Sequence, residues 1–336
     1  MRSIVWTSEP LSRALRDLLP SEVVVASSAS EFFAAKRDAK TVSIIDQVVL
    51  GDFNRAALES GVRVDQIGPV ITIFDEPLQN TIGWVAAHPW LSHVMSSGML
   101  RHPIAAEHLR NVIATLTSNR PPRLLDWLGP TINGRRVRLA RASKRVERLE
   151  RLTAYLESRG VGERTVQQLR DAAEELLTNA FYDAPAAAGV TQPISRTRDV
   201  RLPEDSACDM VYGCRDDLAV VRVRDPFGSL SRARLIEVLM RCARTDMQVE
   251  VDETMGGAGL GLWRIFTVAS FVAIAVVRNR HTEVLVGIGK RVPSARRPFA
   301  FHFFFREDAR AAPGWRLQDA DTTQPQVNQS VTIVTK

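Results

Sequence analysis

The feature that most restricts the fold of this chain is a regular alternation, over its first 118 residues, of short apolar runs with longer amphipathic stretches. The runs are rich in β-branched residues and too short for helices, so they indicate buried strands, whereas the stretches between them have helical spacing. Strands that alternate with helices predict a parallel sheet covered on both faces. The apolar runs lie at residues 3–6, 23–25, 42–45, 70–74 and 93–95.

The composition is that of a folded protein large enough for two domains. The 336 residues are 45% hydrophobic and 24% charged, which excludes wholesale disorder. The net charge is +6, but the basic residues are spread along the chain without interleaved aromatics, so nucleic acid is not expected as a partner. No apolar run is long enough to cross a bilayer and no signal peptide is recognisable, so we expect a cytoplasmic protein that does not enter membranes.

A polar pair interrupts a helix that is otherwise patterned for burial, over residues 171–183. Glu175 and Asn179 are four residues apart and therefore share one face of that helix. A buried helix seldom carries two polar groups side by side without a partner for them, which favours a binding site over the alternative of a solvated surface pair. The stripe on the opposite side, which would face a sheet, consists of Val166, Leu169, Ala173, Leu176 and Ala180.

Two later segments supply groups that suit a nucleotide. A β-branched run over residues 218–224 ends at Asp225, and a carboxylate at a strand end can accept a hydrogen bond from an exocyclic amine. Residues 256–262 read Gly-Gly-Ala-Gly-Leu-Gly-Leu and precede a helical pattern. Glycines let backbone N–H groups approach an anion, and a helix N-terminus favours negative charge, so this loop is a candidate phosphate site. Each segment alone is weak evidence, since most glycine-rich loops are only turns.

In this order the three segments resemble the N, G1 and G2 boxes of the GHKL ATPase superfamily. That superfamily includes histidine kinases, anti-sigma-factor serine kinases, type II topoisomerases, mismatch-repair proteins and Hsp90 chaperones. The resemblance covers residues 133–306. It departs from the family after Asp225, where Pro-Phe precedes Gly228 and the family usually has its glycine two residues after the acid, and at His281-Thr282, where the family commonly has Gly-Thr. It implies an α/β-sandwich (Bergerat) domain that binds ATP and Mg²⁺.

The resemblance also implies roles for individual residues. Asn179 would ligate Mg²⁺, Glu175 would orient or deprotonate the attacking nucleophile, and Asp225 would accept the adenine amino group. Gly228 would let the base lie against the backbone. Asp183, one turn beyond Asn179, either lines the same pocket or is a helix-end acid. The remaining nucleotide-binding positions that the resemblance implies are Gly257, Gly259, Leu260 and Gly261.

Residues 1–118 resemble a response-regulator receiver domain of the flavodoxin-like α/β type. Asp46 follows a predicted strand, where receivers keep their phosphoacceptor, and His102 precedes a proline where they keep a lysine. The acidic pair that would hold Mg²⁺ is reduced to Glu9, and the lysine is absent. Without these charges a phosphoryl-transfer site lacks most of its stabilisation. We therefore predict a degenerate receiver used for docking or dimerisation, with Asp46 as a structural acid.

The remaining segments organise these two parts. We predict a linker over residues 119–132, where paired prolines favour an extended chain, an ATPase domain over residues 133–310 and a flexible tail over residues 311–336. A helix over residues 143–159 either packs on the ATPase sheet or pairs two subunits, so a homodimer remains open. A helix over residues 232–244 occupies the place of the family's ATP lid. Residues 184–207 are polar, so we predict a loop or insertion there, and the runs at residues 209–215 and 218–224 predict a β-hairpin.

These observations favour a signal-transduction protein of the anti-sigma-factor kinase type. It would use Mg·ATP to phosphorylate serine or threonine on a regulatory partner, such as a sigma-factor or anti-anti-sigma-type protein, or would act as an ATP-dependent switch. Two alternatives stay open, a non-catalytic module that senses nucleotide and an atypical histidine kinase. No histidine lies between residues 109 and 280, so the usual acceptor of a histidine kinase is missing from the stretch before the ATPase segment.

Overall fold

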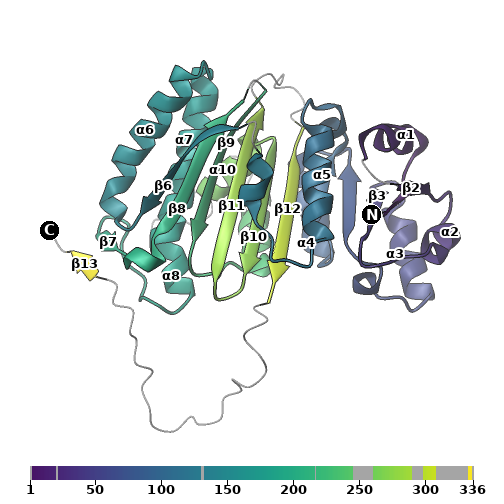
Figure 1. The fold of residues 1–336 in the computed structure, drawn as a ribbon. Helices are drawn as coiled ribbons and strands as arrows, with labels where there is room; N and C mark the ends of the chain where they lie inside the picture. Colours follow the sequence, from purple (N-terminus) through teal and green to yellow (C-terminus); the bar gives the residue numbers. More distant parts are fainter. Residues whose placement is uncertain are drawn as a thin grey trace, which may run out of the picture.

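The computed structural model describes residues 2–19, 22–129, 132–215, 217–244, 260–289, 298–307 and 332–334. These residues form an α/β protein built on an eleven-stranded mixed sheet, which confirms the predicted fold class (Figure 1). The order along the sheet is β2-β1-β3-β4-β5-β12-β10-β11-β9-β8-β6. The strands are β1 (Arg2–Trp6), β2 (Glu22–Val25), β3 (Thr41–Asp46), β4 (Val70–Phe74), β5 (His93–Ser96), β6 (Asn133–Leu139), β8 (Cys208–Cys214), β9 (Leu218–Asp225), β10 (Phe271–Val277), β11 (His281–Gly289) and β12 (Ala300–Arg306).

Helices cover both faces of this sheet (Figure 1). The α-helices are α1 (Glu9–Leu18), α2 (Ala29–Ala34), α3 (Leu50–Glu59), α4 (Leu78–Ala87), α5 (Ala105–Leu116), α6 (Arg145–Ser158), α7 (Glu163–Thr178), α8 (Ala184–Ala187), α9 (Arg232–Arg244) and α10 (Leu260–Val268). Two cores result. One contains residues of α2, α3, α4, α6, α7, α9 and α10, and the other contains residues of α1, α5 and the short 3₁₀ helix η3 (Leu124–Leu128).

The N-terminal half has the predicted flavodoxin-like layout. Its five strands are parallel in the order β2-β1-β3-β4-β5, with helices in the connections. The central strand β3 is buried along its whole length because both faces of the sheet are covered. The alternation of short apolar runs with helical patterns therefore identified both the elements and their class.

Asp46, at the end of β3, has the environment of a structural acid. It is buried, its Oδ2 accepts the backbone N–H of Ser8 at 2.8 Å, and its Oδ1 accepts that of Val49 at 3.2 Å. Glu9, the acid expected near it, forms an exposed ion pair with Arg13 of the same helix instead. The carboxylate of Asp46 thus hydrogen-bonds to the segments that follow β1 and β3, at the carboxyl edge of the sheet.

In the C-terminal half the strands are antiparallel except for β10 and β12, which are parallel. The hairpin of β8 and β9 and the helices α6, α7 and α9 lie where the sequence predicts them. Residues 184–207, expected to be a loop, instead contain α8, a 3₁₀ turn and the short strand β7 (Asp199–Arg201). Within the predicted tail, β13 (Thr332–Val334) pairs antiparallel with β7.

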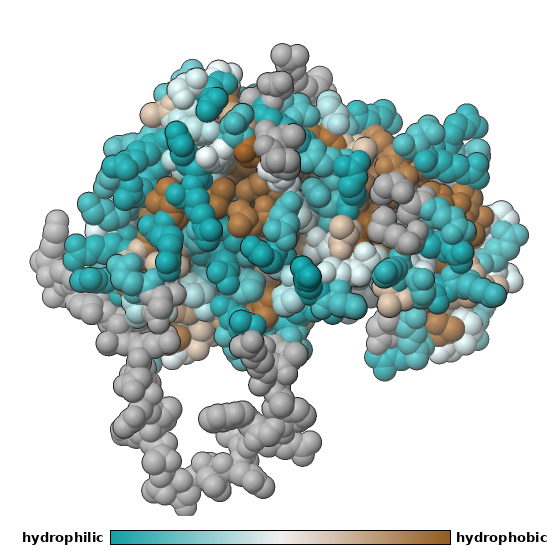
Figure 2. Space-filling view, in the orientation of Figure 1, coloured by the Kyte–Doolittle hydropathy of each residue, from teal (hydrophilic) through white to brown (hydrophobic). Residues whose placement is uncertain are grey.

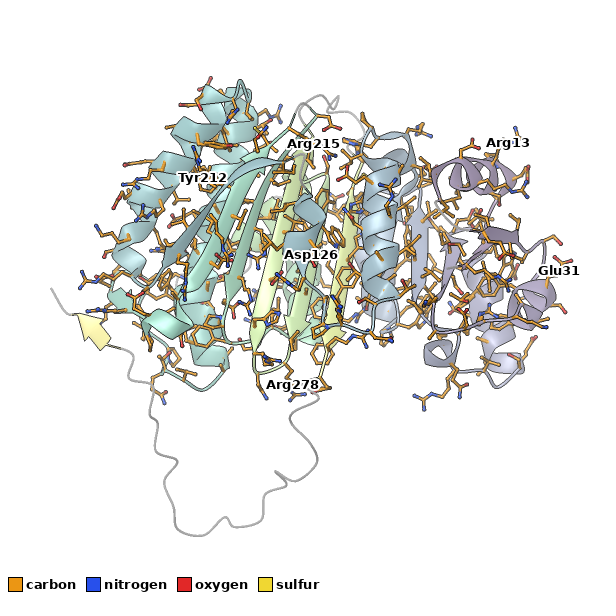
Figure 3. All side chains as sticks on the ribbon, viewed as in Figure 1. Arg13, Glu31, Asp126, Tyr212, Arg215 and Arg278 are labelled. Carbon is orange, nitrogen blue, oxygen red and sulfur yellow. The ribbon has the colours of Figure 1, made fainter. Side chains whose placement is uncertain are left out.

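The two halves meet in one sheet, because β12 pairs antiparallel with β5 and places His302 opposite His93. On the α5 side lies Arg215, which follows β8 (Figure 3). It forms ion pairs with Glu107 of α5 at 2.6 Å and with Asp217 at 2.8 Å. The sequence did not predict this junction. On the face of the molecule seen in Figure 2, hydrophilic residues cover most of the surface and apolar residues are visible between them.

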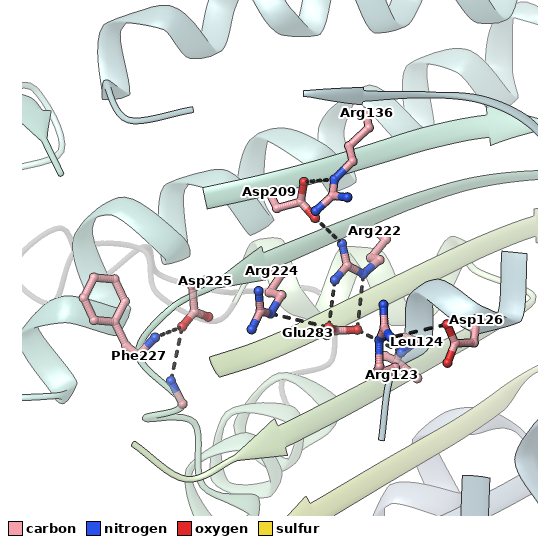
Figure 4. A network of polar contacts seen from close by, with 11 residues as sticks. Arg123, Leu124, Asp126, Arg136, Asp209, Arg222, Arg224, Asp225, Phe227 and Glu283 are labelled. Atoms are coloured by element: carbon pink, nitrogen blue, oxygen red, sulfur yellow. Dashed lines mark hydrogen bonds and ion pairs between the residues drawn. The ribbon is translucent and has the colours of Figure 1, made fainter. Parts of the chain in front are cut away.

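A buried polar network joins the expected linker to the C-terminal strands (Figure 4). The guanidinium of Arg222 on β9 forms ion pairs of 2.7 Å with both Asp209 on β8 and Glu283 on β11. Glu283 also accepts the backbone N–H of Leu124 at 2.8 Å, at the start of η3. Arg136 completes the network through Asp209 at 2.7 Å. Each buried charge of the network therefore has an oppositely charged partner, which offsets the cost of burying it.

Candidate functional site

The site begins on α7, where local geometry places Glu175 and Asn179. The backbone N–H of Asn179 donates to the carbonyl of Glu175, so a regular helical turn connects the two and their side chains share a face. From Asn179 the helix widens to a π-helical turn, and the N–H of Ala184 donates to the carbonyl of Asn179. Such single π turns inside helices are frequent at functional sites. No sequence pattern predicted this turn.

The alternation of β9 and β11 decides which of their residues reach the site. Successive side chains on a strand point to opposite faces of the sheet. Arg222 and Glu283 therefore lie on the linker side, in the polar network, whereas Val223, Asp225 and Thr282 lie on the helix side. Asp225 and Thr282 are directly opposite each other in the β9–β11 ladder. The position of Asp225 at a strand end agrees with the sequence prediction, and its burial follows from this register.

The turn after β9 holds the carboxylate of Asp225. Its Oδ1 accepts the backbone N–H of Phe227 at 2.9 Å and that of Gly228 at 3.3 Å. Gly228 has φ +63°, and a Cβ there would lie 2.2 Å from the carbonyl oxygen of Val277. The glycine is therefore needed for packing against the β10–β11 turn, and it is not among the residues that line the cavity described next. The extra residue between Asp225 and Gly228 is accommodated by this turn.

Helices α7, α9 and α10 and strands β9 and β11 enclose one cavity of about 490 Å³, a volume within the usual range of small-molecule sites. Three residues predicted to belong to the site line this one cavity together: Glu175, Asn179 and Asp225. Asp183 also lines the cavity, which is the first of the two positions predicted for it. Most other lining residues are apolar: Leu176, Ala180, Ala184, Ala186, Ala187, Pro193, Val223, Leu230, Leu235, Val238, Leu262, Ile274 and Val284.

The third segment approaches the same cavity through α10. Gly261 lies so close to Glu175 that a Cβ at this position would be 2.2 Å from the Glu175 carboxyl carbon. Its neighbour Leu262 lines the cavity. Gly261 belongs to the first turn of α10, where backbone N–H groups have no partner within the helix. Gly257 and Gly259 lie outside the described residues, as does the side chain of Leu260.

The carboxylates of the cavity differ in their electrostatics. Burial raises the pKa of Glu175, and Asp183 adds to the rise while Arg196 opposes it. Among the described residues, the buried Oε1 of Glu175 has no hydrogen-bond partner. Burial also raises the pKa of Asp225 to about 6, against the lowering effect of the hydrogen bonds from Phe227 and Gly228. The pKa values of both groups thus lie above that of a solvent-exposed carboxylate, which suits proton transfer and ligand binding.

Two cationic side chains at this site were missed by the sequence reasoning. Arg196 forms an ion pair of 2.8 Å with Asp183, and Arg234 lines the cavity from α9. Arg196 belongs to the segment that was expected to be a loop, and Arg234 is one of several arginines on α9. Neither position carried a distinguishing pattern, because only the packing of α9 and of residues 188–198 selects them.

The donor set is compatible with a nucleotide and a magnesium ion. The cavity joins an apolar chamber to a few polar groups at its wall, as sites for planar bases do. The Asn179 carboxamide is an oxygen ligand of the kind that Mg²⁺ accepts alongside phosphate oxygens and water. Among the described residues, no group of three or more His, Cys, Asp or Glu is placed to hold a metal by itself. Phosphate oxygens would therefore have to supply part of the coordination.

Comparison with known proteins adds little to this geometry. No family model matches the chain, and no curated protein matches it. Among solved structures, the crystal structure of the SiaB-SiaC complex from Pseudomonas aeruginosa is similar with a TM-score of 0.34 and 16% identity, over 49% of this chain and 94% of that chain. A similarity of this degree carries no conclusion about function. Among the described residues, no helix combines the length and apolarity that a membrane span requires.

Proposed function

We propose that the cavity between α7, β9 and α10 binds Mg·ATP in the manner of the GHKL superfamily. The observation that supports this proposal is the shared cavity, because Glu175, Asn179 and Asp225 come from segments up to 50 residues apart and line it together, with Gly261 packed on Glu175. Asp225 would accept the adenine amino group, and the first-turn N–H groups of α10 would face the phosphates. Asn179 would hold the magnesium ion, which would neutralise charge on the phosphate oxygens.

We further propose that the protein transfers the γ-phosphoryl group to a serine or threonine hydroxyl of a regulatory protein partner, such as one of the sigma-factor or anti-anti-sigma type. The Oε1 of Glu175, which lacks a partner among the described residues, would accept the hydroxyl proton. The hydroxyl oxygen forms the new bond to phosphorus while the bond to the bridging oxygen of ADP breaks. The raised pKa of Glu175 makes this carboxylate a stronger base than an exposed one.

Calorimetry with and without Mg²⁺ tests the binding site. Asp225→Ala should weaken nucleotide affinity about 10- to 100-fold, since a hydrogen bond to a charged group is lost. Asn179→Ala should remove the dependence of affinity on Mg²⁺. Asp171→Ala and Asn80→Ala are matched controls, because both residues are exposed helical positions outside the cavity. Equal affinity in wild type, Asp225→Ala and Asn179→Ala would refute the site.

Transfer is tested separately with γ-labelled ATP and cell extract. Glu175→Gln should keep nucleotide affinity and abolish labelling of a partner protein, because the amide cannot accept the proton. Tight binding by wild type without any labelled partner would instead support a module that senses nucleotide without catalysis. Acid-labile label on the protein itself would support a histidine kinase.

A further inference from the structure

Helix α4 of the N-terminal half ends in a carbonyl that has no donor within the helix itself. In an α-helix the carbonyl of Val85 would accept the N–H of the residue four positions later, which here is Pro89 and has no N–H. The last carbonyls of a helix also carry partial negative charge. The C-terminal end of α4 therefore requires a donor, preferably a cation, from elsewhere in the molecule.

Arg232, at the start of α9, supplies that donor across the junction of the two halves. Its Nη2 donates to the carbonyl oxygen of Val85 at 2.7 Å, and lies 3.2 Å from that of His88 and 2.8 Å from that of Leu91. The side chain is half-buried, and burial lowers the pKa of its guanidinium. Helix α9 packs against α4, and both contribute to the same hydrophobic core.

A different side of α9 forms a wall of the cavity. Arg234, Leu235 and Val238 line the cavity, whereas Arg232 and Ile236 lie on another row of residues along the helix. At about 100° per residue the two lines are roughly a third of a turn apart, so the helix presents one face to the cavity and another to α4. A displacement of α4 relative to the sheet would move α9 as a rigid element and would change the position of the cavity wall.

We propose that Arg232 is a positioning residue that couples the nucleotide cavity to the N-terminal half, by fixing α9 to the C-terminal end of α4. The nucleotide part of this proposal rests on the proposed function. Coupling between two sites is reciprocal, so a ligand in the cavity stabilises the α4–α9 contact to the same extent as the contact strengthens ligand binding. A change in the position of α4 in the N-terminal half would then alter the cavity, so a partner that displaces α4 would change the affinity for nucleotide.

Amide hydrogen exchange on the full chain, without ligand, tests the positioning role. Arg232→Ala should speed exchange in the first turns of α9 and at residues 85–91, and Arg232→Lys should restore most of the protection because an ammonium also donates to carbonyls. Arg13→Ala is the control, since Arg13 forms an exposed ion pair at the outer end of the N-terminal half (Figure 3). Unchanged exchange of α9 and of residues 85–91 in Arg232→Ala overturns the proposal, whether or not the protein binds nucleotide.

Calorimetry and exchange with Mg·ATP then test the coupling. Wild type should show slower exchange at residues 85–91 when nucleotide is bound. Arg232→Ala should bind Mg·ATP about 5- to 10-fold more weakly and lose that protection. Arg232→Lys should recover both the affinity and the protection, which distinguishes loss of the carbonyl contacts from a general loss of stability. Affinity and protection equal to wild type in Arg232→Ala overturn the coupling while the cavity assignment stands. Absence of nucleotide binding by wild type refutes the proposed function instead, and the ligand-free exchange still decides the role of Arg232.

Discussion

At the scale of single residues, the raised pKa of Asp225 couples its charge to both stability and binding. Its pKa is about 6 in the folded protein and about 3.8 when exposed. Between these values the unfolded chain loses the proton while the folded protein keeps it, so ionisation of Asp225 opposes folding as pH rises from about 4 to about 6. The burial that prepares this carboxylate for a ligand therefore destabilises the protein at neutral pH.

Asp225→Asn should consequently raise the free energy of unfolding at pH 7 and give no gain below about pH 4. Urea denaturation of wild type and variant at pH 4, 5.5 and 7 measures this difference. The same substitution should weaken nucleotide binding at pH 7, and the wild-type affinity should fall as pH drops below about 6, because the protonated acid accepts hydrogen bonds poorly. A stability difference that does not change between pH 4 and 7 would contradict the burial argument.

At the scale of elements, the contact of α10 with α7 depends on the absence of a side chain at position 261. A Cβ there would overlap the carboxyl group of Glu175, whereas Gly51 on α3 has nothing within 4 Å of the corresponding position. Gly261→Ala should lower the free energy of unfolding by about 1–3 kcal/mol through overpacking. Gly51→Ala should raise it by up to about 1 kcal/mol, since alanine restricts the unfolded chain.

A double-mutant cycle shows whether Glu175 is the group displaced. In Gly261→Ala combined with Glu175→Ala the overlapping atoms are gone, so most of the loss caused by Gly261→Ala should disappear. Chemical denaturation of the four proteins gives the interaction free energy. Strictly additive losses would mean that α10 does not contact α7 through this pair.

At the scale of the whole molecule, three buried histidines occupy the junction of the two halves. His93 on β5 stacks on His302 of β12, and the Nε2 of His302 is 2.9 Å from the Nε2 of His108 on α5. Burial lowers the pKa of His93 and of His108 to about 3, and lowers that of His302 well below its ordinary value. All three are therefore neutral at physiological pH, and their protonation would charge the apolar junction.

Acidification should destabilise the protein through this cluster. Below the ordinary histidine pKa of about 6.5 the unfolded chain gains protons that the folded protein does not, so the free energy of unfolding falls from about pH 6.5 towards pH 3. Because Asp225 acts in the opposite direction over part of this range, the measurement belongs in the Asp225→Asn background. Adding His302→Phe should reduce the slope between pH 7 and 5, and an unchanged slope would place the acid sensitivity elsewhere.

Local patterns in the sequence determined much of this protein. Period-two and period-3.6 spacing identified the parallel N-terminal strands, the β8–β9 hairpin and the helices α7 and α9, because each depends on residues near one another in the chain. The pairing of Glu175 with Asn179 is fixed by one helical turn, and the burial of Asp225 by the alternation of a strand. These three positions were therefore predictable before the cavity that joins them was known.

The tertiary structure alone decided how these parts are joined. The pairing of β5 with β12, the histidine cluster and the contact of Arg232 with α4 connect residues more than 140 positions apart, and no local spacing encodes such contacts. The selection of Arg196 and Arg234 for the cavity, and the packing of Gly228 against the β10–β11 turn, likewise depend on neighbours that only folding brings close. Burial and charge at these places result from surfaces that meet, and a sequence specifies such surfaces through the whole fold and not through any single segment.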